Sequence, residues 1–418
     1  MTDETTLRIG HVMRRFVVDK WGGTETVVFN LCRAFRSMGH TSEIFCTRMF
    51  SEVGTEELDG VPIHRFDYVF PWLFLSNEAQ GKLRLKGGSP LSLPLYRELR
   101  RRRDLSIIHT HIQHRMGGAA RTVARALKIP YVVSVHGGFY TLPEAQIERM
   151  RDPFKGKPEW GKVFGWLWGS RKVLQDASAI LCVGRDEFAD MQARYPTKRV
   201  YYVPNGVDVE RFQNAKPDDF LIAHQIPRDQ RIVLCVSRID FQKNQLMLVR
   251  AFERFAETHP EHHLYLIGPV TVDAYMREIE RALAGSRVRG RVHIIPGLTP
   301  DSPLLPSAYK AAEMFVLPTD HEPFGIVILE AWAAGLPVIA TRVGGIPGFT
   351  HEGSDVLLVN RGDQEALTGA MAELADAPEL RERLVVAGLE EVRSRYDWAS
   401  VAEQVMGIYR TAIEEFGR

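Results

Sequence analysis

Short apolar runs alternate with longer amphipathic segments along the whole chain. The runs have the length and the Val, Ile and Leu content of buried strands. The strands expected from them are 7–13, 43–49, 105–111, 131–137, 179–184 and 199–206 in the first half, and 231–237, 263–268, 291–297, 313–318 and 337–341 in the second. Strands that alternate with helices are typical of parallel sheets. The pattern therefore predicts an α/β protein with a doubly wound sheet in each half.

Several segments between these strands have helical periodicity. In residues 22–40 the apolar side chains recur three and four positions apart, and Gly39 follows them as a stop signal. Helices are also expected over 246–259, 273–285 and 324–335. The boundary between the halves is expected in residues 203–219, which carry two prolines and an Asn-Gly turn and have no helical period.

Composition and cysteine spacing narrow the class of protein. The four cysteines lie far apart and form no CxxC pair, which argues against a disulfide framework or a zinc site. Cys182 and Cys235 lie in apolar runs and are expected to be small core residues. The N-terminus lacks a signal-peptide core, and no apolar run approaches the roughly 18 residues of a membrane span. We therefore expect a cytoplasmic protein.

Charge is distributed unevenly between the halves. Residues 1–214 carry 32 Lys and Arg against 23 Asp and Glu, whereas residues 215–418 carry 21 against 29. Such asymmetry indicates different partners for the two halves. Nucleic acid is excluded as a partner, because no nucleic-acid-binding motif accompanies the basic residues.

Glu322 and Glu330 lie eight residues apart around the expected start of a helix at Phe324 and Gly325. The first N–H groups of a helix lack intrahelical partners and suit a phosphate or sugar oxygen, and a glycine allows close approach of a ligand. Eight helical residues span about 12 Å, wider than the carboxylate pair of a glycosidase. The two carboxylates would then hold two ends of one extended ligand. The alternative is a capped helix with a surface glutamate.

Arg238 and Lys243 follow the end of the strand at 231–237 and precede a helix. Cations at the carboxyl end of such a strand are well placed for a diphosphate, although a solvated pair of loop residues is the alternative. Gly22 and Gly23 open the first helix like a phosphate loop, but without the GxGxxG spacing. His136 ends a strand before Gly137, which suits a side chain presented into a cleft, or a structural histidine.

Three histidines in HTHIQH, namely His109, His111 and His114, raise the question of a metal site. Strand alternation puts His109 and His111 on one face. No carboxylate or cysteine lies nearby in the sequence to complete a usual ligand set, so no metal is expected.

Taken together, these motifs resemble those of the retaining glycosyltransferases of the GT-B fold, in glycosyltransferase family four of the glycogen-synthase-like group. The resemblance covers nearly the whole chain. It rests on GGTE (22–25), HTH (109–111), SVHGG (134–138), VPNGVD (203–208), SRIDFQKN (237–244), LIGP (266–269) and EPFGIVILEAWAAGLPVIATRVGG (322–345). The tail at 395–410 resembles the family's last helix.

The resemblance implies a fold and a division of labour. Two Rossmann-like domains would face each other across a cleft, with residues 1–210 binding the acceptor and residues 211–395 binding a nucleotide-sugar donor. Residues 396–418 would form a helix that crosses back to the first domain.

The resemblance also implies roles for single residues. Arg238 and Lys243 would hold the donor diphosphate, so no divalent metal or other cofactor would be required. Glu322 and the amides of Phe324, Gly325 and Ile326 would bind the transferred sugar, and Glu330 the donor ribose. His136 would lie beside the sugar ring, and Gly22 and Gly23 would touch the phosphates. His109, His111 and Gly137 are candidates for the acceptor side.

Three positions depart from the family pattern. Gly137 stands where Asp is frequent, Gly348 replaces an acid in Gly-Gly-x-Pro-Glu, and Trp332 replaces a smaller residue. The first two make the sugar selectivity uncertain, and none affects the diphosphate residues. The expected reaction is retaining transfer to a carbohydrate, lipid-linked or small-molecule acceptor. The alternatives are a nucleotide-sugar epimerase of the same fold and a non-catalytic nucleotide-sugar-binding protein.

Two segments, 69–94 and 139–172, fit no regular pattern and contain Trp72, Trp160, Trp166 and Trp168 among basic residues. Long irregular insertions are usually functional or mobile. Basic residues attract anionic lipid, and Trp favours the membrane interface. One hypothesis is that the first domain docks on the inner face of the membrane. The alternative is that the aromatic residues fill the core and the charges are solvated.

Overall fold

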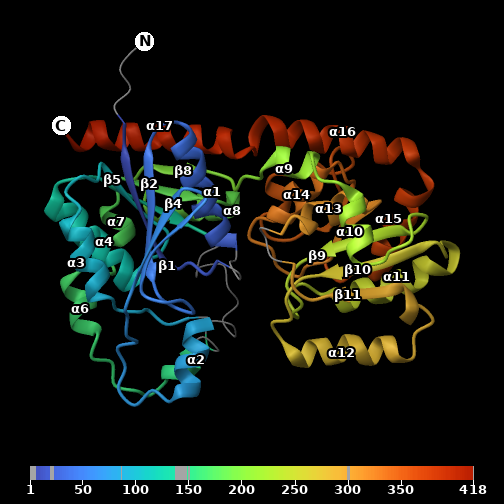
Figure 1. Cartoon of the computed structure of the whole chain (residues 1–418), viewed down its shortest axis with the longest axis horizontal. Helices are drawn as coiled ribbons and strands as arrows, with labels where there is room; N and C mark the ends of the chain where they lie inside the picture. The colour runs from blue at the N-terminus through green and yellow to red at the C-terminus, as the bar shows by residue number, and fades with distance from the viewer. Residues whose placement is uncertain are drawn as a thin grey trace, which may run out of the picture. The chain divides into compact units, whose positions relative to one another are not determined.

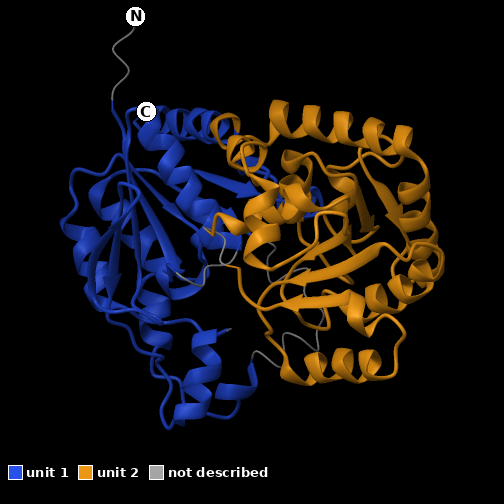
Figure 2. Ribbon diagram, turned by 45° about the vertical axis from the view of Figure 1, so that its right-hand side comes forward, with its two compact units in different colours: residues 1–204, 401–418 blue, residues 205–400 orange. Residues whose placement is uncertain are grey.

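The computed structural model describes residues 6–18, 23–85, 87–136, 148, 151–298 and 302–417. The chain forms two compact units, one of residues 1–204 with 401–418 (unit 1) and one of residues 205–400 (unit 2) (Figure 2). The first boundary was expected after residue 210, six residues later than the one at 204. The second was expected after residue 395, five residues earlier than the one at 400. At the first boundary, the N–H of Val207 donates to the carbonyl of Tyr396 (2.7 Å). This bond ties the segment after Pro204 to unit 2.

Unit 1 is built on an eight-stranded sheet in the order β3-β4-β2-β1-β5-β6-β7-β8. Its strands are β1 (Arg8–Arg15), β2 (Thr41–Thr47), β3 (Gly54–Leu58), β4 (Val61–Phe66), β5 (Ile107–Thr110), β6 (Tyr131–Val135), β7 (Ala179–Cys182) and β8 (Val200–Tyr202) (Figure 1). All neighbours pair in parallel except β3 and β4. In the register between β1 and β5, His11 lies opposite His109.

The helices of unit 1 connect and cover these strands. They are α1 (Gly23–Ser37), α2 (Asn77–Leu85), α3 (Leu93–Arg101), α4 (His114–Leu127), η1 (Asp152–Phe154), α6 (Lys162–Leu167), α7 (Val173–Asp176) and α8 (Arg185–Arg194). Gly39, expected to stop the first helix, has a φ of +85° just beyond α1. Such a conformation suits glycine, because it carries no Cβ.

Unit 2 is built on a six-stranded parallel sheet in the order β11-β10-β9-β12-β13-β14. Its strands are β9 (Arg231–Val236), β10 (His262–Ile267), β11 (Val292–Ile295), β12 (Met314–Leu317), β13 (Val338–Thr341) and β14 (Leu357–Val359). Its helices are α9 (Val209–Gln213), α10 (Pro217–Ala223), α11 (Gln245–Thr258), α12 (Asp273–Ala284), η2 (Arg289–Arg291), α13 (Leu304–Ala311), α14 (Ile326–Ala334), η3 (Ile346–Gly348), α15 (Gln364–Asp376) and α16 (Pro378–Arg395).

The core follows the alternation of the strands. Along β9, Ile232 and Leu234 belong to one buried cluster, whereas Val233 and Cys235 belong to the cluster on the opposite face. Both faces of the sheet are thus covered, as expected of a parallel sheet. The four cysteines are buried free thiols, which confirms the expectation for Cys182 and Cys235.

The last helix, α17 (Trp398–Phe416), returns the end of the chain to unit 1. Tyr409 is fully buried, and its ring packs against Phe35 with the centroids 5.5 Å apart. Its hydroxyl lies 2.6 Å from Nδ1 of His109. These contacts confirm the expected return of the C-terminal helix.

The two segments that fit no regular sequence pattern, 69–94 and 139–172, contain short helices between irregular stretches in their described residues. The first contains α2 and the start of α3, and the described part of the second contains η1 and α6. All four of these elements have nine residues or fewer, too short to show periodicity. Among the described residues, no helix combines the length and apolar character needed to span a bilayer.

Candidate active site

The strand order of unit 2 reverses between β9 and β12, which are neighbours in the sheet. In open α/β sheets, ligands bind outside the carboxyl ends of the strands at such a reversal. Arg238 and Lys243 follow β9, and Glu322 follows β12. Topology alone therefore brings the two strongest sequence motifs to one edge of the unit 2 sheet.

The turn after β9 is organised by a buried aspartate. Asp240 accepts from the backbone N–H of Lys243 at 3.1 Å, and its other oxygen lies 2.9 Å from the Arg238 guanidinium. The Arg238 side chain keeps 46 % of its surface exposed. Gly268 (φ +147°) follows β10, and a Cβ there would lie 2.0 Å from the carbonyl oxygen of Ser237. The glycine of the LIGP motif is required because this turn packs directly against it.

Lys243 and Glu322 form an ion pair between the two motifs. The Lys243 Nζ donates to Oε2 of Glu322 at 2.5 Å, and the side chains are only 11 % and 12 % exposed. Gln242 holds the same two loops together, because its side chain donates to the carbonyl of His321 at 2.8 Å. The pair places an ammonium and a carboxylate together at the carboxyl edge of the sheet.

The loop from Glu322 to Gly325 precedes α14, which begins at Ile326. Glu322 thus lies outside the helix, so the 12 Å expected for a continuous helix does not apply. Gly325 has a φ of +107°, and Phe324 is buried. A Cβ on Gly345 would lie 2.1 Å from the carbonyl oxygen of Pro323. The Gly-Gly pair of the RVGG motif therefore packs directly against the backbone of this loop.

Glu330 projects from α14 and accepts a hydrogen bond from the Tyr309 hydroxyl at 2.7 Å. Burial raises the pKa of Glu330, while the Tyr309 hydrogen bond and the charge of Arg211 act in the opposite direction. A carboxylate held this way keeps a second oxygen for a ligand hydroxyl. Nothing in the sequence pattern pointed to Tyr309, which lies in α13.

The departure at Trp332 is accommodated inside unit 2. Its side chain is fully buried, and its Nε1 donates to the carbonyl of Asp355 at 2.9 Å. A Cβ on Gly388 of α16 would lie 2.4 Å from the indole ring. The large side chain fills the space that this glycine leaves open. Gly348, the second departure, ends η3.

In unit 1 the strand order reverses between β1 and β5. His111 follows β5, and His136 follows β6 at the same edge. Nδ1 of His111 lies 2.9 Å from Nε2 of His136, and Nε2 of His111 lies 3.0 Å from Nδ1 of His11. Sequence reasoning missed His11, which lies within β1. Gly23 begins α1, whereas Gly22 and Gly137 lie outside the described residues.

His109 makes no hydrogen bond to the other three histidines among the described residues and contacts two other side chains instead. Its Nδ1 faces the Tyr409 hydroxyl, and its Nε2 lies 2.7 Å from Oγ of Ser134. His11, His109 and His111 have ring nitrogens within 4.8 Å of one another, all three side chains buried. Both nitrogens of His109 and of His111 are engaged in hydrogen bonds, so these contacts would have to break before the cluster held an ion.

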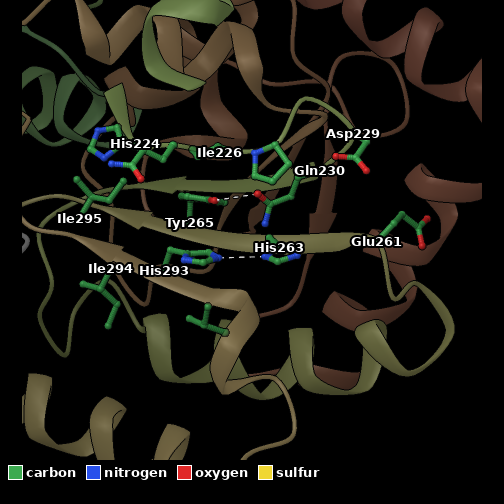
Figure 3. Close-up of a pocket in the computed structure, with 13 residues that line it drawn as sticks. His224, Ile226, Asp229, Gln230, Glu261, His263, Tyr265, His293, Ile294 and Ile295 are labelled. Atoms are coloured by element: carbon green, nitrogen blue, oxygen red, sulfur yellow. Dashed lines mark hydrogen bonds between the residues drawn. The ribbon is translucent and has the colours of Figure 1, made fainter. Parts of the chain in front are cut away.

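A separate pocket of about 730 Å³ lies over the β11 edge of the unit 2 sheet (Figure 3). Figure 3 shows His263 and His293 side by side, with Nδ1 of His263 3.0 Å from Nε2 of His293. Burial lowers the pKa of His263 to about 4. No residue expected to act on the donor lines this pocket. It includes Gln230 and Glu261, which precede β9 and β10 and so lie at the opposite ends of those strands.

Comparison with known proteins identifies the family. Residues 21–211 match the model of Glycosyltransferase Family 4, and residues 218–390 match that of Glycosyl transferases group 1. The chain is 30 % identical to alpha-maltose-1-phosphate synthase of Mycolicibacterium smegmatis over 73 % of this chain and 79 % of that one.

Solved structures of low identity share the fold. Sucrose-phosphate synthase from Thermosynechococcus elongatus superimposes with a TM-score of 0.73 at 21 % identity, covering 98 % of this chain and 100 % of that chain. Anabaena Alr3699/HepE, solved in complex with UDP and glucose, gives 0.71 at 15 % identity, covering 97 % and 100 %. Two Rossmann-like units, the returning C-terminal helix and these matches establish the GT-B fold. The chain is a glycosyltransferase and belongs to glycosyltransferase family four.

Proposed function

We propose that this enzyme transfers a sugar from a nucleotide-diphosphate donor to an acceptor hydroxyl, with retention of the anomeric configuration and without a metal ion. The observation that carries the proposal is the buried Lys243–Glu322 pair at the strand reversal of unit 2. It joins a cation suited to a diphosphate and a carboxylate suited to sugar hydroxyls. Arg238 adds a second, more exposed cation on the same turn.

In this mechanism the bond between the anomeric carbon and the diphosphate oxygen breaks, and its electron pair stays on the diphosphate. Arg238 and Lys243 stabilise that developing charge, the work that a divalent cation does elsewhere. The acceptor oxygen bonds to the anomeric carbon from the face that the diphosphate leaves, and its proton passes to the departing diphosphate oxygen. Glu322 and the amides of Phe324, Gly325 and Ile326 orient the sugar.

Glu330 is assigned to the hydroxyls of the donor ribose, and His136 is the candidate group of unit 1 for the transferred sugar. Gly22 and Gly23 are assigned to the phosphates. His109, a candidate for the acceptor side, has both ring nitrogens engaged by Tyr409 and Ser134, which gives it a structural task as well.

The donor is tested first. Anabaena HepE has been solved with UDP-glucose, which makes UDP-sugars the first donors to try. A donor that binds only the native state raises the melting temperature. UDP-, GDP- and ADP-glucose are compared on wild type and on Arg238→Ala. A shift that is specific to one nucleotide and lost in the variant supports the site, whereas equal shifts in both proteins contradict it.

Product analysis tests the reaction itself. With the donor identified and a panel of sugar, sugar-phosphate and polyol acceptors, proton NMR of the fresh product should show the donor's anomeric configuration. Turnover should persist in EDTA. An inverted product, or turnover that EDTA abolishes and magnesium restores, would contradict the mechanism. Incubation of the donor alone, followed by a search for its epimer, separates transfer from the epimerase alternative.

The acceptor is proposed to lie at an anionic membrane surface, because of one face of α6. Val163, Trp166 and Leu167 recur three and four positions apart on that helix and are 59, 79 and 57 % exposed. Segments 71–85 and 151–172 together carry eight Lys and Arg against three Asp and Glu. They lie side by side, because the N–H of Leu73 donates to the carbonyl of Pro158. Exposed aromatic and aliphatic groups among cations suit the interface of anionic lipid.

The tryptophans divide between surface and core. Trp168 is buried and stacks on Tyr96 with centroids 5.1 Å apart, so its removal would damage the fold. Vesicle flotation should therefore use Trp166→Ser with Leu167→Ser. The matched control is Ile222→Ser, an equally exposed aliphatic site in unit 2. Wild type and control should float with anionic vesicles at low salt, and the α6 variant should not. If wild type stays with the soluble fraction, the acceptor is not presented by anionic lipid.

A further inference from the structure

Three histidines from three neighbouring strands form a continuous chain of hydrogen bonds in unit 1. Nε2 of His136 lies 2.9 Å from Nδ1 of His111, whose Nε2 lies 3.0 Å from Nδ1 of His11. The rings stack, with centroids 5.2 and 5.3 Å apart. The chain begins at a partly exposed side chain at the edge of the sheet and ends at a side chain that is fully buried.

All three imidazoles are neutral near pH 7. Burial lowers the pKa of His11 to about 3 and that of His136 to about 4, and it lowers the pKa of His111 well below its ordinary value. A neutral imidazole carries one N–H, so it donates through one nitrogen and accepts through the other. Two arrangements of the whole chain follow, and no mixed arrangement makes both hydrogen bonds.

In the first arrangement His136 donates from Nε2 to His111, His111 donates from Nε2 to His11, and the N–H of His11 is at its own Nε2. In the second, His11 donates from Nδ1 to His111, and His111 donates from Nδ1 to His136. His136 then carries its N–H on Nδ1. The ring nitrogen of His11 that carries the proton thus decides whether Nδ1 of His136 is a hydrogen-bond donor or an acceptor.

The buried end of the chain distinguishes the two arrangements. Nε2 of His11 is inaccessible to solvent and has no hydrogen-bond partner among the described residues. The first arrangement would bury an N–H donor without an acceptor, which is rare in folded proteins. The second leaves only an unused lone pair there. In the second arrangement the N–H of His136 is on Nδ1, which makes no hydrogen bond to the described residues.

We propose that His11 and His111 are positioning residues that fix His136 as the Nδ1–H tautomer, so that His136 donates a hydrogen bond to an oxygen of the bound sugar. This inference rests on the proposed function in one respect, because the sugar is taken as the acceptor of the hydrogen bond from His136. The tautomer itself is a property of the free protein and can be measured without a substrate.

The test is two-bond proton–nitrogen NMR of the free enzyme labelled with ¹⁵N-histidine, with signals assigned by single substitutions. His136 should show the Nδ1–H pattern, although free neutral histidine prefers Nε2–H. His11→Met removes the donor and places a thioether sulfur, which only accepts, near Nε2 of His111. The N–H of His111 should then move to Nε2, and His136 should shift toward Nε2–H. His11→Asn places an amide N–H near the position of Nδ1 and should restore the Nδ1–H pattern. Ser134→Ala, which removes a partner of His109 only, should leave it unchanged.

The kinetic readout separates this inference from the proposed function. His11→Met should lower kcat by about 10- to 100-fold, as loss of an orienting partner does, while the KM for donor changes little and His11→Asn recovers most of the loss. An Nε2–H pattern at His136 in wild type, or an unchanged pattern in a folded His11→Met, overturns the proposal. A changed tautomer with unchanged kcat overturns the assigned role of His136 and leaves the histidine chain established.

Discussion

Replacing Lys243 by Met tests whether the buried ion pair serves catalysis or only the fold. The substitution keeps the length of the side chain and removes its charge, so Glu322 is left as an unpaired carboxylate that is 12 % exposed. Breaking a buried pair in this way costs about 3–5 kcal/mol. Because both side chains keep about a tenth of their surface in water, we take the lower end, about 3 kcal/mol. For a domain of this size, that lowers the melting temperature by about 6–12 °C.

The double variant Lys243→Met with Glu322→Gln separates the two roles. The double variant contains no unpaired charge, so most of the lost stability should return. The stability effects of the two substitutions are therefore not expected to add, because the two residues are in contact. Activity should not return. Loss of the cation on the leaving group should lower kcat/KM by about 10²- to 10³-fold in Lys243→Met, and the double variant should be no better.

The assay combines calorimetry with initial rates at saturating and limiting donor for wild type, both single variants and the double variant. Recovery of both stability and activity in the double variant would mean that the pair is only structural. A Lys243→Met enzyme with normal kcat/KM would also refute the assignment of Lys243 to the diphosphate.

Three further predictions address the rest of the site. Arg238→Ala should leave the melting temperature nearly unchanged, because the side chain is half exposed, yet initial rates should show kcat reduced by about 10²- to 10³-fold; a normal rate would remove Arg238 from the diphosphate site. Gly345→Ala forces a Cβ against the carbonyl of Pro323 and should disrupt donor binding in calorimetry, whereas Gly285→Ala, which meets no atom within 4 Å, should bind normally. The raised pKa of Glu330 means that its ionisation opposes folding as pH rises above the carboxyl's ordinary range. Glu330→Gln should therefore raise the melting temperature at pH 7 but not at pH 4, and should weaken donor binding.

The sequence predicted the parallel strands and the positions of the main motifs well, because these are local features. Buried strands appear as apolar runs, and Arg238, Lys243 and Glu322 lie next to strand ends that the runs define. The pairing of Lys243 with Glu322 is different, since 79 residues separate them. Only the neighbourhood of β9 and β12 in the sheet brings them together.

The histidine chain shows what local patterns miss. His11 lies inside an apolar strand and resembles a core residue by position, and His111 lies 100 residues away. Their contact depends on the order β1-β5-β6, which is a property of the fold. The short helix α6 was missed for another reason, because six residues are too few for a periodic signal and three of them are exposed apolar side chains.

The return of residues 401–418 to unit 1 has a consequence for synthesis of the chain. Domains generally fold as they emerge from the ribosome, N-terminal part first. Here the segment that covers Phe35 and contacts His109 through Tyr409 is made only after the whole of unit 2. Unit 2, a continuous stretch from 205 to 400, is therefore complete before unit 1 has all its residues. A fragment that ends at residue 204 would lack a part of its own core, and it would require residues 401–418 to be rejoined to it.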